Sequence, residues 1–202
     1  ILSRVIHEGA VNGVGNISTK KIASALRITE PTIYVHFQNK NNLTSVAYKK
    51  AFASLYGGTS LEKSEERCDS LERSILVLLQ NAKRFPEETI YVFNYHHLPG
   101  FHPQDPKKNQ AGSAFYETLA SLWNKTTDEE DSHLVDQRVY DCAFELMDLF
   151  AYEAAIGALD DSSLTAKFVH ALALGGLEGG KTHFLSSLNE EEKKGIKKIK
   201  KY

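Results

Sequence analysis

The sequence predicts an all-α fold, and three observations support this prediction. Proline is rare, with five in 202 residues, and four of the five lie between residues 86 and 106. No Asn-Gly or similar two-residue turn joins two segments of alternating apolar residues, so no β-hairpin is indicated. Apolar residues instead recur at spacings of three and four, which is the periodicity of one buried helix face.

This periodicity predicts each helix in chain order. Residues 133–158 give a clear example, in which one face carries Leu134, Val135, Val139, Ala143, Leu146, Met147 and Phe150. Helix starts are marked by side chains that serve as N-caps, at Ser18, Thr29 and Ser132. The charged tail Glu190–Tyr202 is expected to be a solvated helix or a frayed end. The predicted helices are Ile1–Gly9, Thr19–Leu26, Glu30–Phe37, Lys40–Leu55, 65–84, 87–96, 111–126, 133–158 and 163–188.

Charge is distributed unevenly along the chain, although the net charge is only −2. Residues 1–50 carry a net charge of +5, residues 51–189 carry −10, and residues 190–202 carry +3. A basic head on an acidic body favours a polyanion as the partner of the head. The body, in contrast, is expected to have a different task. We expect the chain to divide into a head domain at residues 1–46 and a larger domain at residues 47–202.

Residues 18–40 are predicted to form two short helices joined by a tight turn at Leu26–Thr29. The apolar residues that would pack the two helices together are Ile22, Ala23, Leu26, Ile28, Ile33 and Phe37. Pro31 fits the first turn of the second helix, because the amides there have no intrahelical partner. The face that remains outward carries hydrogen-bonding, aromatic and basic groups, which suits insertion into a major groove. Its residues are Glu30, Thr32, Tyr34, Val35 and His36.

This segment resembles the DNA-binding module of the TetR family of bacterial transcriptional regulators. The resemblance covers about residues 1–55 and rests on Ile22-Ala23, followed eleven residues after Ile22 by Ile33-Tyr-x-His-Phe-x-Asn-Lys40. It implies that Thr19 and Lys20 contact phosphate and that Thr29 caps the second helix. It further implies base contacts by Glu30, Pro31, Thr32 and Val35, and backbone contacts by Tyr34, His36 and Lys40. A carboxylate can accept from cytosine N4, and a methyl group can meet thymine.

The turn departs from the family pattern, which commonly has glycine where this chain has Arg27. If the position requires a positive φ, arginine costs about 1 kcal/mol relative to glycine. Contact between Arg27 and a phosphate would offset this cost, so we include Arg27 among the expected DNA contacts.

The resemblance also implies a C-terminal domain that binds a small ligand and dimerises through its last two long helices. Small residues four apart let another helix approach closely, and the alternative is packing within one monomer. The candidate dimer residues are Ala171, Gly175, Gly176, Gly179 and Gly180. Aromatic side chains suit a pocket for a planar or amphipathic ligand, and ordinary core packing is the alternative for each of them. The candidate pocket residues are Tyr91, Tyr95, Phe115, Tyr116, Trp123, Phe144 and Met147.

Two further motifs offer alternative functions. Gly175–Thr182 satisfies the phosphate-loop pattern of a nucleotide-binding enzyme, but Ala166–Leu174 before it has the character of a helix where that loop requires a strand. His96, His97 and His102 suit a helical metal sensor. Adjacent histidines on a helix point about 100° apart, however, and the spacing matches no recurrent zinc pattern.

We therefore expect a non-enzymatic, ligand-responsive transcriptional regulator that binds a palindromic double-stranded operator as a homodimer. We expect the protein to repress transcription until a small-molecule effector relieves the repression, and activation is the alternative mode of regulation. No cofactor or metal is expected. No membrane partner is expected either, since no stretch of about 18 uncharged apolar residues occurs. Cys68 and Cys142 are 74 positions apart in no CxxC arrangement, which favours a cytoplasmic location.

Overall fold

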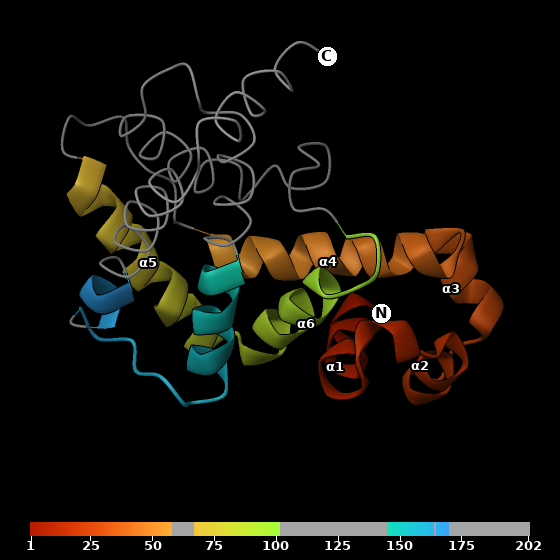
Figure 1. Cartoon of the computed structure of the whole chain (residues 1–202). Helices are drawn as coiled ribbons and strands as arrows, with labels where there is room; N and C mark the ends of the chain where they lie inside the picture. Colours follow the sequence, from red (N-terminus) through yellow and green to blue (C-terminus); the bar gives the residue numbers. More distant parts are fainter. Residues whose placement is uncertain (58–66, 102–144, 164, 170–202) are drawn as a thin grey trace, which may run out of the picture.

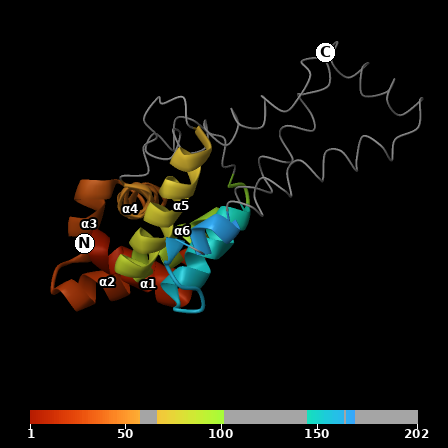
Figure 2. The same cartoon turned by 90° about the vertical axis from the view of Figure 1, so that its left-hand side faces the viewer.

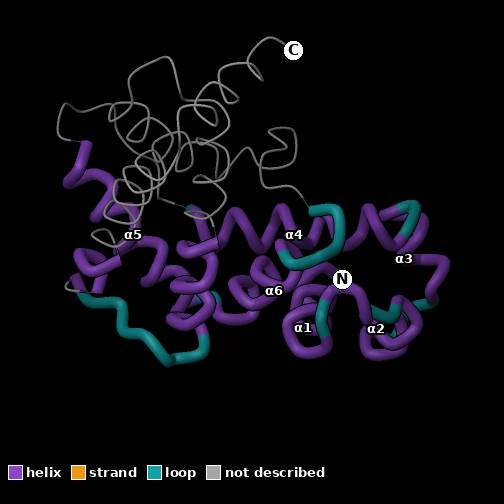
Figure 3. The backbone as a smooth tube through the Cα atoms, viewed as in Figure 1, coloured by secondary structure: helices purple, strands orange, loops and turns teal. Residues whose placement is uncertain are grey.

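The computed structural model describes residues 1–57, 67–101, 145–163 and 165–169, and all regular structure in these residues is helical (Figure 1, Figure 3). This confirms the predicted all-α fold. The labelled elements are α1 (Leu2–Asn12), the 3₁₀ turn η1 (Val14–Asn16), α2 (Thr19–Leu26), α3 (Glu30–Phe37), α4 (Lys40–Tyr56), α5 (Arg67–Arg84) and α6 (Pro86–His96). Residues 145–155 form a further helix, and residues 165–169 are helical.

The short helices α2 and α3 begin and end at the predicted residues, and α4 and α6 each differ from prediction by one residue at one end. The helix α5 ends at the predicted residue 84, and its predicted start at residue 65 lies outside the described residues. The predicted end of α1 at Gly9 is wrong, because the helix continues to Asn12 and ends before Gly13, whose φ is 81°. Gly9 lies inside the helix at a close approach to the ring of Tyr91. The predicted helix 111–126 lies outside the described residues.

The helix of residues 145–155 ends earlier than the predicted residue 158. The amide of Ala158 bonds to the carbonyl of Glu153, and the amide of Gly157 bonds to that of Ala154. Gly157 has a φ of 77°, so these two bonds form the glycine-ended helix terminus known as a Schellman motif. The end at 158 was wrong because apolar periodicity does not register this backbone reversal.

The core of the described chain lies where α1, α4 and α6 pack against one another, as two views of the structure show (Figure 1, Figure 2). The side chains of Ile6, Leu43 and Tyr91 are almost fully buried there. Asn94 of α6 donates to the backbone carbonyls of Gly9 and Ala10 at 3.0 and 3.4 Å. These bonds satisfy carbonyls near the C-terminal end of α1, which have no partner within the helix.

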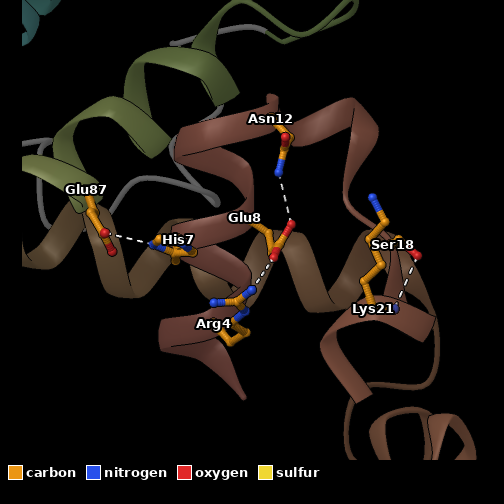
Figure 4. A network of polar contacts seen from close by, with 7 residues as sticks. All are labelled: Arg4, His7, Glu8, Asn12, Ser18, Lys21 and Glu87. Carbon is orange, nitrogen blue, oxygen red and sulfur yellow. Dashed lines mark hydrogen bonds and ion pairs between the residues drawn. The ribbon is translucent and has the colours of Figure 1, made fainter. Parts of the chain in front are cut away.

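Polar side chains add further links between the helices (Figure 4). His7 of α1 lies 2.8 Å from the carboxylate of Glu87 in the first turn of α6. Along α1, Glu8 accepts from both Arg4 and Asn12, at 2.6 and 3.0 Å. At the C-terminal end of α4, Asn81 of α5 donates to the carbonyls of Leu55 and Gly57. The first helix is thereby fixed to α6, and the last turn of α4 to α5.

None of the helices in the described ranges is long and apolar enough to cross a lipid bilayer.

Candidate nucleic-acid interface

The α2–turn–α3 motif is held together by a small apolar contact surface. Ile22 and Ala23 of α2 and Ile33 of α3 are buried, with exposed fractions of 4% or less. Ile28 in the turn and Phe37 at the end of α3 are partly buried against the same core. This is the packing that the apolar spacing predicted, except at Leu26, which is 36% exposed and was wrongly assigned to the inner face.

The outward face of α3 is exposed. Val35 is 80% exposed and Tyr34 is 36% exposed, and Pro31, Thr32 and His36 are exposed as well. Single exposed apolar side chains are common on protein surfaces, so the exposure of Val35 matters here because of its place on the outward face of α3. The face predicted to meet DNA is thus presented to solvent as one surface.

The hydroxyl of Thr19 links the beginnings of α2 and α3. It donates to the carboxylate of Glu30 and lies 3.1 Å from the phenolic oxygen of Tyr34. Thr19 is only 8% exposed, so its hydroxyl is committed to these contacts inside the protein. The structure therefore brings three of the predicted DNA contacts into one hydrogen-bonded cluster, which spacing along the sequence did not indicate.

Two of the predicted N-caps, Ser18 and Thr29, belong to this motif and have different outcomes. Ser18 caps α2, and its hydroxyl accepts from the amide of Lys21 at 3.4 Å (Figure 4). Thr29 occupies the N-cap position of α3, but its side chain makes no capping bond, so the predicted side-chain cap is wrong. Its hydroxyl instead lies 2.8 Å from the hydroxyl of Thr32, one turn along the helix.

Arg27 has a left-handed backbone conformation, in which arginine is less favourable than glycine. Its φ is 55° and its ψ is 39°, and its side chain is exposed. Gln38, at the end of α3, has a φ of 62° and is the second non-glycine residue with positive φ in the described ranges. Both strained positions flank α3, and both side chains point away from the core.

The two predicted basic contacts at either side of α3 are placed differently. Lys20 is exposed at the start of α2. The ammonium group of Lys40 donates to the carbonyl of Gly15 at 3.1 Å, which ties the start of α4 to the η1 segment. Asn39, which precedes Lys40, caps α4 by accepting from the amide of Asn42 at 2.8 Å. Only two residues, Gln38 and Asn39, therefore separate α3 from the rigid helix α4.

Three of the predicted pocket residues lie in the described residues. Tyr91 is fully buried and donates its hydroxyl to the carbonyl of Thr44 at 3.0 Å. Burial, followed by the neighbouring Tyr95, raises the pKa of the Tyr91 phenol far above its ordinary value. Tyr95 stacks on Tyr48 with ring centroids 4.2 Å apart, and Met147 is fully buried. The predicted pocket residues Phe115, Tyr116, Trp123 and Phe144 lie outside the described residues.

The histidines considered as metal ligands do not converge. His97 is exposed and its Nδ1 lies 2.8 Å from the carbonyl of Phe93. Both ring nitrogens of His96 have protein partners, Tyr48 and Asp148. Within the described ranges no group of three or more His, Cys, Asp or Glu side chains is arranged to hold a metal ion. His102 lies outside those ranges, as do the phosphate-loop pattern Gly175–Thr182 and the five candidate dimer residues.

Sequence reasoning missed the contact that joins Tyr48, His96 and Asp148. His96 had been singled out, but only as a member of a histidine cluster. No local spacing connects the three residues, since they lie on α4, on α6 and on the helix of residues 145–155.

The comparisons with known proteins agree with this geometry. Residues 8–45 match the family described as bacterial regulatory proteins, tetR family. None of the curated proteins is similar to the chain in sequence. A solved structure of a TetR-like transcriptional regulator from Rhodococcus sp. RHA1 has the same fold, with a TM-score of 0.61 and 16% sequence identity, over 88% of this chain and 93% of that chain.

The matched residues run from α1 into α4 and include the whole α2–turn–α3 motif. This motif, with its exposed recognition face, lies within a TetR-like helical fold. Residues 8–45 are therefore similar to the tetR family of bacterial regulatory proteins, and the fold is similar to that of a TetR-like transcriptional regulator.

Proposed function

We propose that the chain is a cytoplasmic repressor that binds a palindromic operator as a homodimer and is released by a small-molecule effector. In this proposal α3 enters the major groove, with Glu30, Pro31, Thr32 and Val35 toward the bases. Contacts to the sugar-phosphate backbone come from Lys20, Arg27, Tyr34, His36 and Lys40, whereas Thr19, whose hydroxyl is bonded to Glu30 and Tyr34, holds these two residues in place instead of contacting phosphate as the resemblance implied. Thr29, at the N-cap position of α3, lies at the same surface, and its hydroxyl is exposed. Residues 1–46 form the DNA-binding domain and residues 47–202 the effector and dimer domain.

The observation that carries the proposal is the 80% exposure of Val35 in the middle of an α3 whose inner face is buried. A helix anchored by Ile33 and exposed on the other side has the shape that major-groove reading requires. The charge of +5 on residues 1–50 supports the same partner. A dimer would carry two of these basic segments, so the affinity for DNA is expected to fall steeply as the salt concentration rises.

The proposal is tested by selecting bound duplexes from a pool of random-sequence DNA with the full chain. The recovered duplex is expected to contain two inverted half-sites with centres about one helical turn apart, as two-fold symmetry requires. Recovery of no sequence at low salt, or of single half-sites bound by a monomer, would contradict the proposal. The recovered duplex then serves as the operator for screening compounds that release the protein.

Two substitutions separate DNA reading from folding. Val35→Asp places a carboxylate on the exposed face of α3, where phosphates repel it, and is expected to abolish the gel shift. Val11→Asp is the matched control, because Val11 is 66% exposed on α1, outside the motif. Both variants are expected to keep the melting temperature of the parent chain, since exposed substitutions usually change stability by less than about 0.5 kcal/mol. Equal binding by the two variants would contradict the assignment of α3 to the groove.

A further inference from the structure

A buried chain of hydrogen-bonding groups joins three helices of the described structure. The phenolic oxygen of Tyr48 on α4 lies 2.9 Å from Nε2 of His96, the last residue of α6. Nδ1 of His96 lies 2.9 Å from a carboxylate oxygen of Asp148, on the helix of residues 145–155. The side chains of His96 and Asp148 are each 3% exposed. We call these three residues the buried relay.

The chemistry of the groups gives the buried relay a direction. An ionised carboxylate only accepts hydrogen bonds, so the Asp148 contact assigns a proton to Nδ1 of His96. In the neutral imidazole Nε2 is then an acceptor, and Tyr48 donates to it. Asp148 thereby selects the imidazole tautomer whose Nε2 can accept from Tyr48, as a carboxylate orients many histidines that bind metals or act as bases.

Aromatic rings confine the buried relay. Tyr95 stacks on Tyr48 with centroids 4.2 Å apart, and Phe101 stacks on the His96 ring at 4.7 Å. Phe52, one turn after Tyr48 on α4, lies 5.4 Å from the Tyr48 ring. A polar group buried among such rings is costly to leave unpaired, so a shift of any one relay member is opposed unless the others follow.

The position of Tyr48 connects the relay to the DNA-binding motif. Tyr48 lies in the middle of α4, and α4 is separated from α3 only by Gln38 and Asn39. Lys40 further ties the start of α4 to Gly15. A displacement of α4 at Tyr48 is therefore carried to α3 by a continuous helix and a short connection.

We infer that His96 is a positioning residue that transmits the placement of the 145–155 helix to α4 and so to α3. Operator affinity then depends on Asp148, a residue on a helix far along the chain from the DNA-reading motif. The expected effect on operator affinity rests on the proposed function, whereas the expected coupling between the helices concerns the protein without DNA. It assigns a role to the one histidine of the 96–102 cluster that is buried in the described residues.

The test compares variants that break the relay with one that keeps it. His96→Leu removes both hydrogen bonds, Tyr48→Phe removes one end, and Asp148→Asn removes the charge at the other end. His96→Gln retains a donor for Asp148 and an acceptor for Tyr48, and is expected to rescue the relay. Tyr91→Phe is the matched control, because it also removes a buried α6–α4 hydrogen bond, to the carbonyl of Thr44, without touching Asp148.

The first readout is amide hydrogen exchange of α4 and α3 in the DNA-free full chain. Asp148→Asn is expected to accelerate exchange in the middle of α4, where Tyr48 lies, although it changes no residue of α4. The second readout is affinity for the duplex recovered by selection. Tyr48→Phe and Asp148→Asn are each expected to lower it by at least about twofold, and their double variant no further than the stronger single variant. Tyr91→Phe combined with Asp148→Asn is expected to multiply the single effects.

Two outcomes would overturn the inference. One is faster exchange confined to residues 145–155 in Asp148→Asn, with α4 unchanged. The other is an effect of His96→Gln equal to that of His96→Leu, which would make His96 a packing residue. If no duplex is recovered while the exchange results follow expectation, the proposed function fails and the relay stands as a link between α4 and the 145–155 helix.

Discussion

The hydroxyl of Thr19 donates a hydrogen bond to the carboxylate of Glu30 and so joins the first turn of α2 to the first turn of α3. Tyr34, one turn further along α3, brings its phenolic oxygen to 3.1 Å from the same hydroxyl. Because Thr19 is 8% exposed, these contacts replace hydration that folding removes. The two helices of the motif are thus fixed at the ends where the proposed phosphate and base contacts begin.

Replacing Thr19 by valine is expected to destabilise the module and weaken operator binding together. The substitution keeps the shape of the side chain but removes the donor to Glu30, so the free energy of unfolding should fall by about 1 kcal/mol. Urea unfolding and gel shifts with the selected duplex measure the two effects. Thr29→Val is the control, because the Thr29 hydroxyl is exposed and its loss should change stability by less than about 0.5 kcal/mol. Equal losses in the two variants would show that the Thr19–Glu30 bond has no special role.

Arg27→Gly is expected to change stability and DNA binding in opposite directions. Glycine adopts a φ of 55° without steric cost, so the free energy of unfolding should rise by about 1 kcal/mol. Loss of a phosphate contact should at the same time lower affinity and reduce the salt slope by about one. Gln38→Gly relieves a φ of 62° but removes no charge, so it should raise stability and leave the salt slope unchanged.

Arg27→Ala completes the comparison, since it keeps a Cβ and removes only the guanidinium. If it leaves both affinity and salt dependence unchanged, Arg27 does not contact phosphate.

The sequence was sufficient to predict α2 and α3 because their boundaries depend on local signals. Ser18 caps its own helix, and Pro31 fits a first turn whatever lies elsewhere in the chain. The cap at Thr29 was mispredicted because a nearby hydroxyl, that of Thr32, competes for the same side chain. Local rules give the available partners but do not decide between them.

The remainder of the site depends on contacts between distant parts of the chain. Gly9 was interpreted as the end of α1, whereas it lies within the helix beside the Tyr91 ring, and nothing near Gly9 in sequence indicates that neighbour. The buried relay is similar, because three residues on three helices become partners only after the helices pack. The burial of Thr19, likewise, depends on α3 and could not be inferred from its place at the start of α2.

Gly9→Ala is expected to destabilise the fold through this contact. A Cβ at Gly9 would lie 2.3 Å from Cε2 of Tyr91, and that ring cannot move easily because its hydroxyl is bonded to Thr44. Overpacking of this kind costs about 1–3 kcal/mol, which exceeds the helix propensity that alanine gains. Urea unfolding measures the loss. Gly9→Ala combined with Tyr91→Leu should recover part of the stability, and a stabilising effect of Gly9→Ala alone would contradict the packing.

Acidic pH is expected to weaken the hydrogen bonds that Asp160 accepts from Ser162 and Thr165. Hydrogen bonds from Thr165 and then from Ser162 lower the pKa of Asp160 from 3.8 to about 2. A carboxyl group with a lowered pKa in the folded state contributes stability above its ordinary pKa, and this contribution is lost as the pH falls from about 4 toward 2. The carboxyl resonance of Asp160, followed by NMR, should titrate near the lower value. In Thr165→Val, which lacks the strongest donor, it should titrate closer to 3.8. A parent chain that titrates at 3.8 would contradict these hydrogen bonds.

Val35 is expected to recognise a thymine methyl group in each half-site. Its side chain is 80% exposed, so contact with a methyl group in the groove would bury surface that the protein alone leaves in water. Replacing thymine by uracil removes that methyl group and nothing else. Burial of one such group is worth about 0.8 kcal/mol, so uracil at the contacted position should lower parent affinity about fourfold. Val35→Ala should bind the thymine and uracil duplexes equally, whereas Val11→Ala should keep the preference of the parent. A uracil effect that persists in Val35→Ala would assign the thymine contact to another residue, and Thr32, also exposed on α3, carries the only other aliphatic methyl group among the proposed base-facing side chains.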